Sequence, residues 1–104
     1  MDVEVRFVEG CPNLPFTRQR LGVALDAVGR GDIDVRLRAV RTDAEAAELG
    51  FTGSPTILIN GADPFAHSHS LVGLSCRLYS TAEGVSGSPS VEQLITALAN
   101  VDPE

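Results

Sequence analysis

Apolar and polar residues alternate over Val3 to Val8 and again over Ile33 to Val40, which predicts two β-strands that each bury one face. Between these strands, Gly29 and Gly31 end a run of apolar residues at helical spacing: Phe16, Leu21, Ala24, Leu25 and Val28. Proline at 12 or 15 suits the first turn of that helix. A helix that links two strands in this way makes a βαβ unit, so we expect the two strands to lie side by side and parallel.

The middle of the chain predicts a short helix followed by a buried strand. Thr42 or Asp43 can cap a helix that runs to Leu49, because a side-chain oxygen there satisfies free backbone amides, and Gly50 is placed to end it. An apolar run over residues 55–60, bounded by glycines, is typical of a buried strand. A polar loop from residue 62 to about residue 73 follows it.

The last third predicts one more strand and a closing helix. Residues 74–79 alternate again and are expected to pair with the preceding strand, and Ser90 is expected to cap a helix with one apolar stripe: Val91, Leu94, Ile95 and Leu98. We therefore predict one α/β domain over residues 1–104, in the order β-α-β-α-β-β-α. Its four-stranded mixed sheet should carry helices on both faces.

The charge composition limits the classes of partner that the chain is expected to bind. The 104 residues carry a net charge of −6, and all eight basic residues are arginines. Because phosphate binding needs clustered positive charge, we expect no nucleic-acid partner. Arg36, Arg38 and Arg41 form a local basic strip that we interpret as a solvated strand face.

No apolar stretch is long enough to span a bilayer, and the first residues lack the basic start of a signal peptide. We therefore expect a cytoplasmic protein with no membrane partner. Two cysteines in a reducing compartment are expected to be reactive or simply buried, not a structural disulfide.

Two short motifs carry a resemblance to a known superfamily. Cys11 lies in Gly10-Cys-Pro-Asn-Leu14, directly after the first strand, and Pro55 lies in Gly53-Ser-Pro-Thr56, directly before the third. Cysteine and proline are 55 − 11 = 44 residues apart, the kind of spacing that one intervening strand and helix require. In this arrangement the chain resembles the thioredoxin-like superfamily over essentially its whole length.

The resemblance implies a reactive Cys11 that faces a cis-proline at Pro55. A thiol at a helix N-terminus meets unpaired amides and the positive end of the helix dipole, and both favour the nucleophilic thiolate. The family's cis-proline turns the neighbouring backbone toward that sulfur, where a peptide or thiol can hydrogen-bond to it. The expected substrate-binding residues are Pro12, Ser54, Pro55 and Thr56. The expected partner is a protein disulfide or a low-molecular-weight thiol.

The chain departs from the family at the second cysteine. Leu14 stands where the Cys-x-x-Cys pattern has its resolving thiol, so fast intramolecular release of a mixed disulfide cannot occur within the motif. Cys76 is the remaining candidate for a catalytic partner of Cys11. Because it alternates with Leu74 and Leu78, we favour the alternative that Cys76 is a small buried apolar residue.

Other polar residues admit both functional and structural interpretations. His67 and His69, with Cys76, are possible soft-metal ligands, and a histidine could stabilise the Cys11 thiolate, but we favour a solvated loop. Arg77 is a conceivable anion-binding group, although we favour an exposed strand arginine. Phe51 or Phe65 could give the expected substrate groove beside Pro55 an apolar wall.

Three functions follow from these residues: a thiol-redox protein, a non-catalytic binding module for a peptide, thiol or thiophilic metal, and the handling of mercury or another soft metal by Cys11 and Cys76. The last draws on the runs at residues 54–66 and 73–79, which resemble small actinobacterial thioredoxin-like proteins described as related to alkylmercury lyase. No residue role is carried over from alkylmercury lyase. No nucleotide-binding glycine motif is present, and we expect no cofactor.

Overall fold

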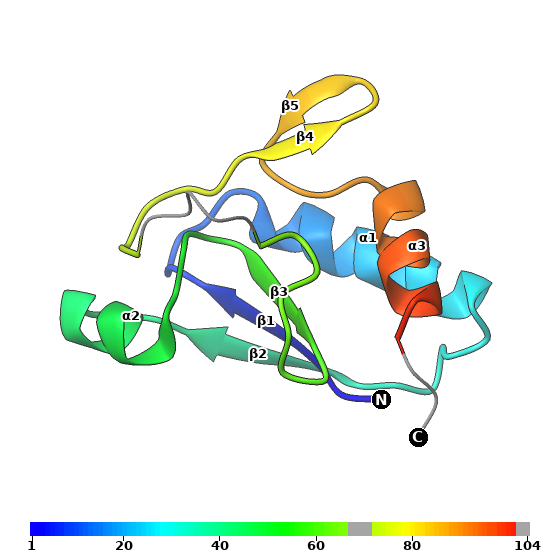
Figure 1. The fold of residues 1–104 in the computed structure, drawn as a ribbon, viewed down its shortest axis with the longest axis horizontal. Helices are drawn as coiled ribbons and strands as arrows, with labels where there is room; N and C mark the ends of the chain where they lie inside the picture. Colours follow the sequence, from blue (N-terminus) through cyan, green and yellow to red (C-terminus); the bar gives the residue numbers. More distant parts are fainter. Residues whose placement is uncertain (67–71, 102–104) are drawn as a thin grey trace.

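The computed structural model describes residues 1–66 and 72–101 of the chain. Figure 1 shows the strands and helices in a mixed α/β arrangement. In chain order the elements are β1 (Val3–Phe7), α1 (Leu14–Ala27), β2 (Val35–Ala39), α2 (Asp43–Leu49), β3 (Thr56–Ile59), β4 (Tyr79–Thr81), β5 (Gly84–Ser86) and α3 (Val91–Ala99). The α/β class predicted from the sequence is thereby confirmed.

Strand β1 lies at the centre of a three-stranded sheet, in the order β2-β1-β3. It pairs with β2 in parallel, as the βαβ pattern predicts, and with β3 in antiparallel. Alternation in β1 places the fully buried Val3 and Val5 on one face, where their strand partners in β3 are Ile59 and Ile57. Strand β2 is an edge of this sheet. Arg36 and Arg38 are exposed, as the basic-strip interpretation requires.

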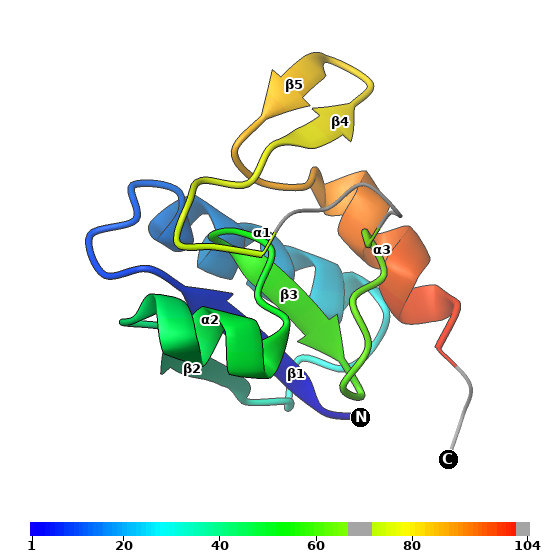
Figure 2. The ribbon, with the colours of Figure 1, turned by 60° about the vertical axis from the view of Figure 1, so that its left-hand side comes forward.

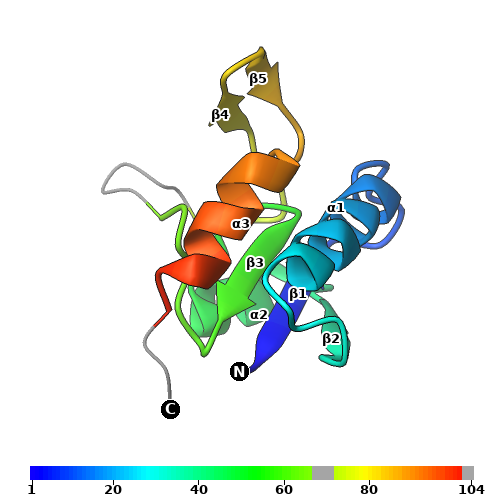
Figure 3. The ribbon, with the colours of Figure 1, turned by 90° about the vertical axis from the view of Figure 1, so that its right-hand side faces the viewer.

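Helices α1 and α3 pack side by side over this apolar face of the sheet, as Figure 3 shows. Leu21 and Leu25 of α1 meet Leu94 and Leu98 of α3 above the strands, and all four are buried. These side chains form the main core. The apolar stripe predicted for α3 is confirmed at Leu94 and Leu98, whereas Phe16 of α1 is exposed.

Helix α2 lies on the opposite side of the sheet, beside β2 (Figure 2). It closes a second, smaller core around Val40, Ala46 and Phe51. The predicted start and stop of this helix are confirmed: the Thr42 side chain accepts a hydrogen bond from the Glu45 N–H, and Gly50 adopts φ +64°. Phe51 is only 1% exposed in this core, so it is no wall of a groove.

The cap of α3 is also as predicted. The Ser90 hydroxyl accepts from the Gln93 N–H at 3.1 Å, and the Gln93 side chain accepts from the Ser90 N–H at 2.9 Å. This reciprocal capping box satisfies two amides that the first turn of a helix otherwise leaves free. Among the described residues, no helix is long and apolar enough to cross a membrane.

The predicted four-stranded sheet is wrong. Strand β4 begins only at Tyr79 and pairs with β5 in a separate antiparallel hairpin, which projects from the top of the molecule in Figure 1. Residues 75–77 pair with the segment just before β3 through one isolated parallel bridge, between Ser54 and Cys76. The segment is held there by side-chain contacts of Arg77 and Tyr79, described below, and not by a ladder along β3.

Candidate thiol site

Cys11 lies in a tight turn between β1 and α1. Its N–H donates to the Val8 carbonyl at 3.0 Å, and Gly10 takes φ +80°, a conformation that favours glycine. The Leu14 N–H in turn donates to the Cys11 carbonyl at 3.3 Å, and α1 begins at Leu14. This turn places a half-buried thiol-bearing residue just before the helix, as predicted.

Cys76 is held beside Ser54 by two backbone hydrogen bonds. The Ser54 N–H donates to the Ser75 carbonyl at 2.8 Å, and the Arg77 N–H donates to the Ser54 carbonyl at 2.9 Å. The peptide bond that follows, between Ser54 and Pro55, is cis, as the family resemblance implied. This single parallel bridge therefore fixes the position of Cys76 beside Ser54.

Ser54 also connects this bridge to the turn of Cys11. Its hydroxyl accepts a hydrogen bond from the Val8 N–H at 3.0 Å, while the Val8 carbonyl accepts from Cys11. The Ser54 residue is 1% exposed, so these bonds are shielded from water. Both cysteine-bearing segments are thus tied to one buried serine.

The two cysteines line the same small pocket, of about 210 Å³, which is bounded by residues 8–12, Ser54 and residues 74–76. Both thiols are free. Of the four predicted substrate-binding residues, Pro12 and Ser54 line this pocket, whereas Pro55 and Thr56 do not. Thr56 instead donates its hydroxyl to the Gly53 carbonyl at 2.5 Å.

The favoured interpretation of Cys76 as a buried apolar residue is wrong, because Cys76 is exposed. Leu74 and Leu78, with which it alternates, are also exposed, Leu78 to 70%. The buried face of this segment is the other one, made by Arg77 and Tyr79. The alternation was real, but it did not identify the face that packs inward.

Arg77 is likewise not the exposed strand arginine that we favoured, since it is only 7% exposed. Its guanidinium forms an ion pair with Asp63 at 2.5 Å and donates to the Phe65 carbonyl at 2.7 Å. It also lies 4.8 Å from the centre of the Tyr79 ring, a cation–π distance. Arg77 thus anchors the segment that carries Cys76.

Tyr79 adds further contacts to this anchor. Its hydroxyl donates to the Pro55 carbonyl, and its ring meets Phe65 edge-on at 5.5 Å. Burial raises the pKa of the Tyr79 phenol well above its usual range, and the nearby Arg77 charge opposes this only in part. The phenol therefore stays protonated, and remains a donor to Pro55, well above neutral pH.

Several residues of the site were missed from the sequence. Glu9 lines the pocket and pairs with Arg41 at 2.9 Å, and Asp63 holds Arg77. The one sequence feature that could have indicated this ion pair is the carboxylate of Asp63 in the polar loop between Gly61 and Gly73. His67 and His69 lie outside the described residues, and within the described ones no group of three possible ligands from histidine, cysteine, aspartate or glutamate converges.

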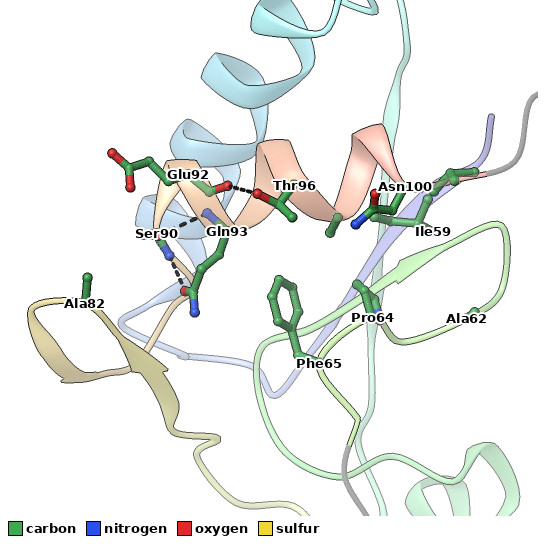
Figure 4. Close-up of a pocket in the computed structure, with 12 residues that line it drawn as sticks. Ile59, Ala62, Pro64, Phe65, Ala82, Ser90, Glu92, Gln93, Thr96 and Asn100 are labelled. Atoms are coloured by element: carbon green, nitrogen blue, oxygen red, sulfur yellow. Dashed lines mark hydrogen bonds between the residues drawn. The ribbon is translucent and has the colours of Figure 1, made fainter.

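A larger pocket, of about 620 Å³, lies between α3, the loop before residue 66 and the β4–β5 hairpin. Figure 4 shows Phe65 rising toward α3, from which Gln93 points down. Glu92 is the one ionisable side chain among the described residues that line it, and Gln93 is already bonded to Ser90 and the Ser80 carbonyl. Both cysteines line the smaller pocket, so we take that pocket as the candidate site.

Phe65 therefore lines the large pocket and not the one beside Cys11, contrary to one sequence-based option. No protein-family model, no curated protein and no solved structure matches the chain.

Proposed function

We propose that the protein is a thioredoxin-like thiol-redox protein in which Cys11 and Cys76 interconvert between two thiols and one intramolecular disulfide. The observation that carries this proposal is that both cysteines line one pocket, on segments that Ser54 ties together. Cys76 then supplies the resolving thiol that Leu14 cannot supply within the motif. A reducing compartment such as the cytoplasm would keep the pair ready to react.

The reaction balances without a bound cofactor. The Cys11 thiolate attacks one sulfur of a substrate disulfide, forms a mixed disulfide and expels the first thiolate. Cys76, after losing its proton to water, attacks the Cys11 sulfur, forms the Cys11–Cys76 bond and expels the second thiolate. Two electrons pass from the cysteine pair to the substrate, and a low-molecular-weight thiol would return them.

Exposure of the reduced protein to cystamine, a small disulfide, tests this mechanism. We expect the wild type to lose both free thiols and to become lighter by two hydrogens, because the internal disulfide expels the adduct. Cys76→Ser should instead accumulate one cysteamine adduct at Cys11. Intact-protein mass spectrometry after acid quenching distinguishes the reduced protein, the internal disulfide and the cysteamine adduct.

The matched variant Cys11→Ser serves as the control, since it keeps Cys76 and removes the proposed nucleophile. It should form its adduct more slowly than Cys76→Ser does. A wild-type protein that accumulates two adducts, or that only forms disulfide-linked dimers, would contradict the proposal, because both results require the two thiols to act independently.

The same pair of thiols favours a second function, the binding of one soft metal ion. Thiolate sulfur is the ligand that ions such as Cu(I) and Hg²⁺ prefer, and two thiolates suffice for linear coordination. One equivalent of Hg²⁺ should then protect both cysteines from alkylation, and either cysteine-to-serine substitution should weaken binding by at least about 100-fold. Two ions bound independently would rule this function out.

A further inference from the structure

The backbone polar groups of Ser54, Pro55 and Val8, beside the thiol pocket, are already hydrogen-bonded within the chain. The Ser54 N–H and carbonyl are bonded to Ser75 and Arg77, and the Pro55 carbonyl accepts from the Tyr79 hydroxyl. Proline has no N–H to offer. On the facing wall, the Val8 N–H and carbonyl are bonded to Ser54 and Cys11.

This arrangement bears on substrates that bind as an extended chain. A polypeptide that adds to a protein as a strand gains its affinity from unpaired backbone donors and acceptors on the receiving edge. At Ser54 and Pro55 the chain's own residues 75–79 have taken those groups. An extended peptide could pair with Ser54 and Pro55 only by displacing this segment.

The segment is held too firmly to be displaced at little cost. Arg77 is buried against Asp63, the Phe65 carbonyl and the Tyr79 ring, and withdrawal of the segment would break all these contacts together. Gly53 adds to the constraint, because a Cβ at that position would lie 2.9 Å from the Arg77 Cβ. The backbones of residues 53 and 77 are thus in direct contact.

The space that remains is small. The pocket of about 210 Å³ lies below the roughly 300–1,000 Å³ of usual ligand sites. Resting on the proposed function, we propose that the Cys11–Cys76 site takes low-molecular-weight disulfides and excludes disulfides carried on extended polypeptides. The substrate is then a compact disulfide, which the cysteine pair reduces to two thiols while itself becoming the Cys11–Cys76 disulfide.

A matched pair of probes tests this selectivity. One probe is cystamine, and the other is a soluble nine-residue peptide whose central cysteine carries the same cysteamine group in disulfide linkage. The rate of Cys11–Cys76 disulfide formation is measured for each by quenched-flow mass spectrometry. Each rate is then divided by the rate at which the same probe reacts with free dithiothreitol, which removes differences in the intrinsic reactivity of the two probes. We expect the normalised rate with cystamine to exceed the peptide rate by at least about tenfold.

The outcomes separate the inference from the function on which it rests. Equal normalised rates, or a faster peptide, would overturn the selectivity and leave the redox function intact. Failure of both probes to oxidise the pair would overturn the redox function itself. Arg77→Met tests the cause, because loss of the anchor should raise the peptide rate relative to cystamine. If that variant does not fold, the wild-type ratio alone decides.

Discussion

Replacement of Asp63 by asparagine is expected to lower the free energy of unfolding by about 3–5 kcal/mol, the usual cost of leaving one member of a buried ion pair without its partner. The Arg77 side chain is 6% exposed and the Asp63 side chain 15%, so water cannot replace the lost carboxylate charge. Urea unfolding followed by far-UV circular dichroism measures the change. The measurement also tests whether the segment of Cys76 is anchored as the contacts indicate.

A surface ion pair provides the matched control. Glu9→Gln breaks the ion pair with Arg41, in which the Arg41 side chain is 68% exposed and the Glu9 side chain 64%. It should change the free energy of unfolding by no more than about 1 kcal/mol. The double variant Asp63→Leu, Arg77→Met should be more stable than Asp63→Asn, because it leaves no buried charge behind. Equal losses for Asp63→Asn and Glu9→Gln would show that the Arg77 pair does not anchor the fold.

Local sequence signals were sufficient for much of this fold. The caps at Thr42 and Ser90, the glycine at the end of α2 and the parallel pairing of β1 with β2 all follow from a few neighbouring residues. Each depends on hydrogen bonds within one turn or on the handedness of a single crossover. Such features can be predicted because no distant part of the chain decides them.

The segment from residue 74 to residue 79 could not be predicted in the same way. A period of two gives two candidate faces, and the apolar content of Leu74 and Leu78 favoured the wrong one. Burial of Arg77 is decided by Asp63, which lies 14 residues earlier in the chain and supplies the compensating charge. A partner of this kind leaves no periodic signal near residue 77.

The candidate site could be predicted only in part, because some of its residues lie in local motifs and others are positioned by tertiary contacts. Cys11 and Ser54 could be chosen from motifs that lie next to a strand end, and both line the pocket. Cys76 was named as a possible partner, but its approach to Cys11 depends on the bridge with Ser54 and on the Arg77 anchor. Its position is a property of tertiary contacts, so the sequence left the buried and reactive interpretations both open.

Substitution of Gly53 by alanine is expected to have the second large effect, on both stability and thiol chemistry. Gly53 adopts φ +123°, a backbone conformation that residues with a side chain rarely adopt. The Cβ of the alanine would lie 2.9 Å from the Arg77 Cβ and 3.2 Å from the Arg77 backbone N and Cα. Backbone strain and the forced shift of Arg77 together should cost about 2–5 kcal/mol. We also expect the Cys11–Cys76 disulfide to form at least about tenfold more slowly with cystamine, because the displaced backbone carries Cys76 with it.

Gly50→Ala is the matched control for this prediction, since Gly50 also has a positive φ, +64°, but a Cβ there would meet nothing within 4 Å. It should cost only the backbone penalty, about 1–2 kcal/mol, and leave the rate of disulfide formation unchanged. The ratio of the two disulfide rates therefore isolates the contact between residues 53 and 77 from general loss of stability. If Gly53→Ala folds and forms the disulfide as fast as Gly50→Ala, the backbone at Arg77 does not position Cys76, and the thiols meet by some other constraint.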